Sequence, residues 1–177
     1  MVIEDIRQYI HICNYKNGMI IMNYISPTKG RMSIGDVVQD IVAFMEEESS
    51  ASYKLIIGTD SQSRENSCFV TAVIVHRVGK GARYYYRRKY MSHAKSLRHK
   101  IFTETSMSLD AVTRLKEELA KTRYKDMDVE VHVDIGQNGD TKELIREVVG
   151  WVMGSGFKVK IKPNACGATK VADRYTK

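Results

Sequence analysis

Residues 55–62 read Leu55-Ile56-Ile57-Gly58-Thr59-Asp60-Ser61-Gln62, an apolar β-strand that ends near a carboxylate. Residues 129–136 read Val129-Glu130-Val131-His132-Val133-Asp134-Ile135-Gly136 and have the same form. A charge at the end of a buried strand is costly unless something pairs with it. Two carboxylates at the ends of strands from one sheet can meet over a divalent cation. The two stretches therefore predict one sheet that carries a metal-dependent site.

Around these strands, apolar periodicity and turn signals predict the order βββαβαβα. The first three strands are joined by hairpin connections, so they are antiparallel, and the later strands follow right-handed βαβ crossovers. The predicted strands are 55–60, 68–78, 82–91, 129–135 and 157–161. The first predicted helix is 97–121. The second is capped by Asp140 and Glu143 and ends at Gly154 and Gly156, and the third is a terminal segment at 168–175. The result is a mixed α/β fold with a five-stranded sheet and helices on its faces.

Residues 1–52 are predicted to form an N-terminal extension to this domain, which spans 53–177. Ser33 and Asp36 form a capping box, and helically spaced apolar residues follow, which predicts an amphipathic helix at 34–47. A strand at 19–24 after the Asn17-Gly18 turn signal would make a hairpin with residues 9–13. Residues 3–10 fit a short helix equally well.

The composition is that of one globular domain, with 177 residues, 43% apolar and 28% charged. No apolar run is long enough to cross a membrane, and the N-terminus lacks the features of a signal peptide, so we expect a cytoplasmic protein without a membrane partner. The three cysteines, Cys13, Cys68 and Cys166, are too widely spaced for a zinc pair and are expected to be reduced thiols. The net charge of +7 permits a polyanionic partner such as nucleic acid. The sequence gives no oligomeric state.

The order of elements and the placement of acids resemble the ribonuclease H-like superfamily over residues 53–177. Particular motifs look like its YkuK-type family: Gly58-Thr59-Asp60-Ser61-Gln62, Asp134-Ile135-Gly136 with Asn138-Gly139, Gly150-Trp151-Val152, Ile161-Lys162-Pro163 and Val171-Ala172-Asp173-Arg174. The resemblance implies a carboxylate site made of Asp60, Glu104, Asp134 and Asp173. It also implies two Mg²⁺ or Mn²⁺ ions about 4 Å apart, which activate water and stabilise the leaving oxygen in phosphodiester hydrolysis. Asp60 would then bridge the ions, Glu104 and Asp134 would hold one ion and orient water, and Asp173 would complete the second site.

Each acid also has a purely structural interpretation. Asp134 can make an Asx-turn, Glu104 can be a solvated helix residue, and Asp173 can pair with Arg174 or Lys177. Asp140 fits an N-cap and is the reserve ligand should Asp173 fail. The sequence departs from ribonuclease HI at two places: no His precedes the last helix, and Ser61 follows the first Asp in place of the usual Gly.

A basic and aromatic run, Arg83-Tyr84-Tyr85-Tyr86-Arg87-Arg88-Lys89-Tyr90, precedes the long helix. Its composition suits phosphate contacts and base stacking, but it also suits a half-exposed strand at a sheet edge. The basic residues continue towards Glu104. The candidate nucleic-acid contacts are Arg83, Arg87, Arg88, Lys95, Arg98 and Lys100.

The sequence thus predicts a metal-dependent nuclease, and two alternatives stay open. One is a catalytically silent nucleic-acid-binding module that keeps the fold. The other is a metal-dependent phosphohydrolase that acts on nucleotides. RNA, DNA, hybrid and junction substrates are not distinguished.

Overall fold

The computed structural model describes residues 14–16, 19–21, 23–62, 66–92, 96–136, 142–165 and 167–176. Helices and strands alternate along the chain in the predicted mixed α/β manner, which confirms the fold class. The strands are β1 (Asn14–Lys16), β2 (Met19–Ile21), β3 (Tyr24–Ser26), β4 (Gly30–Met32), β5 (Tyr53–Gln62), β6 (Asn66–Arg77), β7 (Gly81–Ser92), β8 (Val129–His132) and β9 (Lys158–Lys160). The helices are α2 (Ile34–Glu46), α3 (Leu97–Leu119), α4 (Ile145–Gly154), which follows a 3₁₀ turn at Lys142–Leu144, and α5 (Gly167–Thr176).

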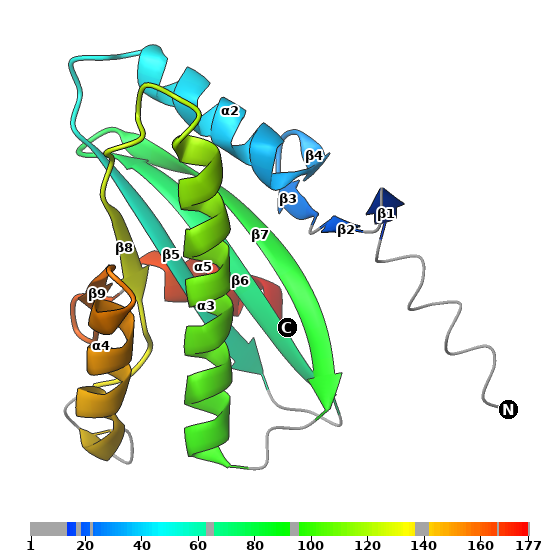
Figure 1. Ribbon diagram of the computed structural model, residues 1–177, viewed down its shortest axis with the longest axis vertical. Helices are drawn as coiled ribbons and strands as arrows, with labels where there is room; N and C mark the ends of the chain where they lie inside the picture. The colour runs from blue at the N-terminus through cyan, green and yellow to red at the C-terminus, as the bar shows by residue number, and fades with distance from the viewer. Residues whose placement is uncertain are drawn as a thin grey trace, which may run out of the picture.

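Seven strands form the main sheet, in the order β4-β3-β7-β6-β5-β8-β9. The long strands β5, β6 and β7 are antiparallel neighbours, and β8 and β9 run parallel to β5. Of the described helices, α2, α3 and α4 lie on one face of the sheet, and α5 crosses the other face (Figure 1). The sheet therefore has an α3 face and an α5 face.

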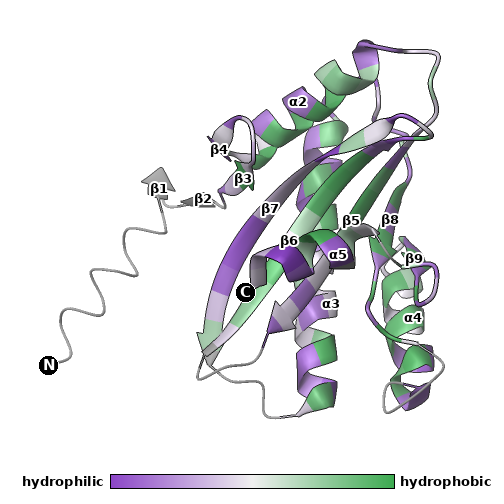
Figure 2. Ribbon diagram, turned by 180° about the vertical axis from the view of Figure 1, so that it is seen from behind, coloured by the Kyte–Doolittle hydropathy of each residue, from purple (hydrophilic) through white to green (hydrophobic). Residues whose placement is uncertain are grey.

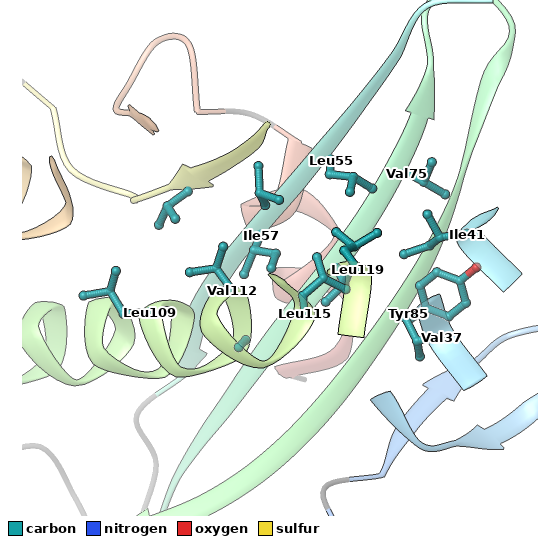
Figure 3. Close-up of a cluster of buried hydrophobic side chains, with 14 of the residues drawn as sticks. Val37, Ile41, Leu55, Ile57, Val75, Tyr85, Leu109, Val112, Leu115 and Leu119 are labelled. Atoms are coloured by element: carbon teal, nitrogen blue, oxygen red, sulfur yellow. The ribbon is translucent and has the colours of Figure 1, made fainter. Parts of the chain in front are cut away.

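The larger hydrophobic core lies on the α3 face. Leu55 and Ile57 of β5 pack there against Val112 and Leu115 of α3, and residues of α2 close the same core beside Tyr85 (Figure 3). Ser33 is the N-cap of helix α2, and its side chain and backbone share a capping box with Asp36, as predicted. Burial of this apolar surface is the main force that fixes α3 along the strands.

A smaller core lies under α5. Alternate residues of the strands, among them Ile56, Val70 and Tyr86, contact Ala168 and Ala172 of α5. Seen from behind, α5 crosses the middle of the strands, and the ends of β5, β6 and β7 run on past it with no described helix in front of them (Figure 2). The α5 face is therefore only partly covered.

The number of strands differs from the predicted five. Strands β3 and β4 of the N-terminal segment extend the sheet, because β3 pairs with β7 through Ile25 and Tyr86. The predicted single strand at 19–24 is also wrong: β2 ends at Ile21, and β3 begins at Tyr24 in another sheet. Strand β2 does pair antiparallel with a preceding strand, but that strand is β1, three residues long; residues 9–13 and Asp140 lie outside the described residues.

The boundaries of the other elements match the predictions to within a few residues. Strand β8 ends at His132, so Val133–Ile135 follow it as a loop, which is nevertheless tied to β9 by the Val133 N–H to Lys160 carbonyl bond of 3.0 Å. In the described part of the chain, every helix is too short or too polar to span a bilayer.

Candidate acidic site

The Gly58-Thr59-Asp60-Ser61 stretch of β5 divides its side chains between the two faces, because successive residues of a strand point to opposite sides. Thr59 and Ser61 face α3. Thr59 Oγ1 accepts a bond of 2.9 Å from the Ser108 hydroxyl and lies 3.0 Å from Thr71 Oγ1. Gly58 and Asp60 face α5. The motif thus holds α3 with its hydroxyls and presents a carboxylate on the other face.

Gly58 is required by the close approach of α5. A Cβ at this position would lie 2.7 Å from Ala168 Cβ and 2.8 Å from the His132 carbonyl oxygen. No real Cβ tolerates such contacts, so any larger residue would push α5 away from the strands. Gly58 therefore sets the distance between the helix that carries Asp173 and the strand that carries Asp60.

Asp60, Asp134 and Asp173 are brought to the same region. Gly58 of β5 pairs with His132 of β8, and the next residues of the same parity are Asp60 and Asp134. Asp134 and Asp173 both act electrostatically on Asp60. Burial is the largest cause that raises the pKa of Asp60, and the two neighbouring carboxylates raise it further, whereas the Ser61 N–H bond of 2.8 Å and Lys100 oppose them.

Glu104 approaches the same strand end from the α3 side. Its side chain is buried, with a residue exposure of 4%, and its Oε1 accepts a bond of 2.7 Å from the Ser61 hydroxyl. Burial raises the pKa of Glu104 to about 7, and Asp60 and Asp134 add to the increase, while Ser61 and Lys100 lower it. Electrostatic coupling therefore links Asp60, Glu104 and Asp134 to one another, and Asp173 is coupled to Asp60.

Two lysines balance part of this negative charge. Lys162 Nζ lies 2.8 Å from Asp134 Oδ1, and Lys100 Nζ lies 3.7 Å from Glu104 Oε1. Carboxylate oxygens are the donors that Mg²⁺ and Mn²⁺ prefer, so the donor chemistry fits a hard cation. In the described residues, however, no three of His, Cys, Asp and Glu are arranged to hold an ion together. A bound ion would therefore require side chains of the Lys162–Asp134 and Lys100–Glu104 pairs to move.

Two of the predicted nucleic-acid contacts are occupied within the fold. Arg83 donates 2.9 Å to Asp40 and 2.5 Å to Glu47, both on α2. Arg87 is buried, with 8% of its surface exposed, and donates 3.0 Å to Asp110 of α3. Both arginines point to the α3 face, so their charge holds helices to the sheet. Both arginines are thus paired with acids of the fold, and their contact with a polyanion stays a prediction.

The other predicted contacts differ from one another. Arg88 is exposed on the α5 face, Arg98 pairs with Glu147 on α4, and Lys100 pairs with Glu104. Lys95 lies outside the described residues. The basic run is therefore divided between structural and accessible positions, and Arg88 is the member that shares a face with Asp60.

Some residues that shape the site were missed or only partly recognised. Ser61 was noted as a departure from the usual Gly, but its bond to Glu104 needs the position of α3, which periodicity alone does not give. Lys162 belongs to the Ile161-Lys162-Pro163 motif, but its contact with Asp134 joins segments that the sequence pattern does not connect. His132 is buried, and burial lowers its pKa against the opposing effect of Glu130, 3.3 Å away.

Comparisons with known proteins bear on the family of the chain. The family model described as Ribonuclease H-like matches residues 36–177. The chain is also similar to an uncharacterised protein, YkuK, of Bacillus subtilis (strain 168): the two are 36% identical over 162 residues, which cover 85% of this chain and 94% of that protein. No solved structure gives a significant match.

Proposed function

Because the chain belongs to the ribonuclease H-like family, we propose that it is a divalent-metal-dependent nuclease that hydrolyses phosphodiester bonds of nucleic acid. One observation supports this most directly. Asp60 of β5 is coupled electrostatically to Asp134, in the loop after β8, and to Asp173 of α5, and Glu104 of α3 is coupled to Asp60 and Asp134. Packing alone gains nothing from carboxylates that disfavour one another's charge, as Asp134 and Asp173 do at Asp60.

Asp60, Glu104, Asp134 and Asp173 would hold Mg²⁺ or Mn²⁺. When bound, such ions supply an activated water and stabilise the charge on the leaving oxygen. The protein's own residues prepare the site. Ser61 fixes the Glu104 carboxylate through its 2.7 Å bond, and Gly58 lets α5 bring Asp173 close to the strand. Lys100 and Lys162 keep the metal-free carboxylates from driving the elements apart.

A catalytically silent nucleic-acid-binding module is the second candidate. It is favoured by the two lysine pairs, because Lys162 and Lys100 already neutralise part of the charge that a metal ion would otherwise balance. Metal affinity and nucleic-acid binding without cleavage would support this candidate.

The proposal is tested by a cleavage screen with Mg²⁺ and Mn²⁺ on single strands, duplexes, RNA–DNA hybrids and mononucleotides. Asp60→Asn, purified in parallel, reports contaminating nucleases, and Asp126→Asn serves as a matched control because Asp126 is an exposed acid in the turn after α3. We expect metal-dependent cleavage by the wild type and by Asp126→Asn, and none by Asp60→Asn. Activity on mononucleotides alone would favour the phosphohydrolase, and equal cleavage by all three proteins would refute a role for the acidic site.

A further inference from the structure

The alternation of β7 separates its basic and aromatic residues into two sets. Arg83, Tyr85 and Arg87 face α3, where Tyr85 Oη donates 2.7 Å to Asp40 and the arginines form the ion pairs described above. Tyr84, Tyr86, Arg88 and Tyr90 face α5. The second set is thus on the same side of the sheet as Asp60.

The strand register connects this second set to the acidic site. Asp60 of β5 pairs with Val70 of β6, which pairs with Arg88 of β7. The next row of the same face joins Gln62, Cys68 and Tyr90 in the same way. Neighbouring strands lie about 4.8 Å apart, so Arg88 is about 10 Å from Asp60 along its row, and Tyr90 lies one row farther towards the strand end.

Helix α5 covers part of this set. Tyr175 stacks on Tyr86 with ring centroids 3.8 Å apart, and its hydroxyl lies 2.8 Å from that of Tyr84. Arg88 closes this cluster: its guanidinium lies 5.2 Å from the Tyr86 ring centroid, and its Nε donates 2.8 Å to the Tyr175 carbonyl. Tyr90 lies two residues farther along β7 than Arg88 and is 52% exposed.

Tyr90 presents an exposed ring two residues from Arg88 on the same face of β7. Arg88 is fixed at its Nε and against two rings, so its position is defined before any ligand arrives. A ring next to an ordered cation suits a base and its phosphate, because the base stacks on the ring while the cation attracts the phosphate. Bases inside a duplex are already stacked and expose only their edges, so a ring can stack on a base only where the strand is unpaired.

We propose that Arg88 and Tyr90 form a binding subsite for an unpaired nucleotide, and that a single strand runs from this subsite across the α5 face to the acidic site. This inference rests on the proposed function for the direction of the strand, but not for the stacking itself. A distance of about 10 Å or slightly more corresponds to one or two nucleotides between the stacked base and the phosphate at Asp60. The substrate strand would therefore be single-stranded on one side of the cleaved bond.

The test measures binding by fluorescence anisotropy, in EDTA and again with Ca²⁺, for a labelled single strand and for a blunt duplex of the same sequence. The variants are Tyr90→Ala, Tyr90→Phe and Arg88→Ala. The matched control is Lys89→Ala, which removes one exposed charge from the same strand but on the opposite face. Melting curves verify that each variant is folded. The two Tyr90 variants are expected to fold because Tyr90 is exposed.

We expect the single strand to bind more tightly than the duplex. Tyr90→Ala should weaken single-strand binding about 10-fold, whereas Tyr90→Phe should leave it unchanged because the ring remains. Arg88→Ala should reduce the slope of log affinity against log salt by about 0.7, the value for one phosphate contact of a single strand, and Lys89→Ala should not. Equal binding by Tyr90→Ala and wild type, tighter duplex binding, or no binding of either oligonucleotide in both buffers would overturn the proposal.

The two proposals fail separately. Cleavage that requires Asp60 but does not depend on Tyr90 would support the proposed nuclease activity and contradict the proposed subsite. Tyr90-dependent binding without any metal-dependent cleavage would keep the subsite and favour the binding module.

Discussion

The α3 face of the sheet is closed by a long helix, whereas the α5 face is crossed by a short one. Helix α3 has 23 residues and runs along the strands, while α5 has 10 residues. At 1.5 Å per residue, α5 measures about 15 Å, which is the width of about three strands. Neighbours on one strand therefore have different roles: Arg87 is buried against α3, and Arg88 is exposed beside the end of α5. Packing on one face provides the stability that allows charged residues to gather on the other.

The largest expected effect tests the α5 face. Asp60→Asn should lower metal-dependent cleavage at least about 100-fold, because it removes a metal ligand. The melting temperature in EDTA should stay unchanged or rise, since burial and neighbouring carboxylates already raise the pKa of Asp60 and disfavour its charge. Cleavage assays and melting curves on the same preparation provide both measurements.

A clear loss of stability in Asp60→Asn would contradict this expectation and identify Asp60 as a structural partner. Asp126→Asn, at an exposed position, should alter neither measurement.

The second prediction concerns Glu104, which lies between the faces. Its folded pKa of about 7 exceeds the ordinary value of 4.5, so the folded protein keeps a proton that the unfolded chain loses in this range. The associated stability is present below about pH 4.5 and is lost as the pH rises through about 7. Relative to Glu104→Gln, the wild type should lose up to about 3 kcal/mol across this window, at about 1.4 kcal/mol per pKa unit. Urea unfolding in EDTA between about pH 5 and pH 8 measures the difference.

Glu117→Gln is the control, because Glu117 is exposed on the same helix, and its pH profile should parallel that of the wild type. Adding Mg²⁺ at the upper end of the range should restore part of the lost stability, since an ion that binds the charged carboxylates stabilises the folded state. Parallel profiles for the wild type and Glu104→Gln would show that Glu104 ionises normally.

The third prediction compares adjacent arginines on opposite faces. Arg87→Ala should reduce the free energy of unfolding by about 1–3 kcal/mol, because it removes one of the two arginines that pair with Asp110, the other being Arg114, and empties buried space. The estimate is below that for a fully buried pair, since the Asp110 side chain is 37% exposed and solvent screens its charge. Arg88→Ala should cost less than about 1 kcal/mol and act on binding instead. Chemical denaturation of the two variants gives the comparison, and equal losses would contradict the division between the faces.

This division explains how far the sequence could be interpreted. Alternation and strand length predicted β5 and its carboxylate, and helical spacing predicted α2 and α3, because each pattern extends over many residues. The pairing of β3 with β7 was not predictable, since a three-residue strand has almost no periodicity. The run from Arg83 to Tyr90 showed two alternating sets, but only the position of α3 reveals which set is buried. Similarly, the roles of Ser61 and Lys162 depend on contacts between segments that are distant in the sequence. Ser61 and Glu104, for example, are 43 residues apart.

The smallest expected effect concerns Lys162, which pairs with Asp134 at the edge of the α5 face. Its Nζ lies 2.8 Å from Asp134 Oδ1, so a cation that binds Asp134 must displace it or share the carboxylate. Lys162→Gln should therefore raise Mn²⁺ affinity, by up to about 5-fold, because the side chain is 57% exposed and such a pair contributes less than about 1 kcal/mol. Isothermal titration calorimetry with Mn²⁺ measures the change without requiring activity. Lys158→Gln is the matched control, since it breaks a comparable surface pair with Asp128, away from the four carboxylates. If Lys162→Gln and Lys158→Gln bind Mn²⁺ alike, Asp134 is not part of the ion-binding set, and the acidic site would reduce to Asp60, Glu104 and Asp173.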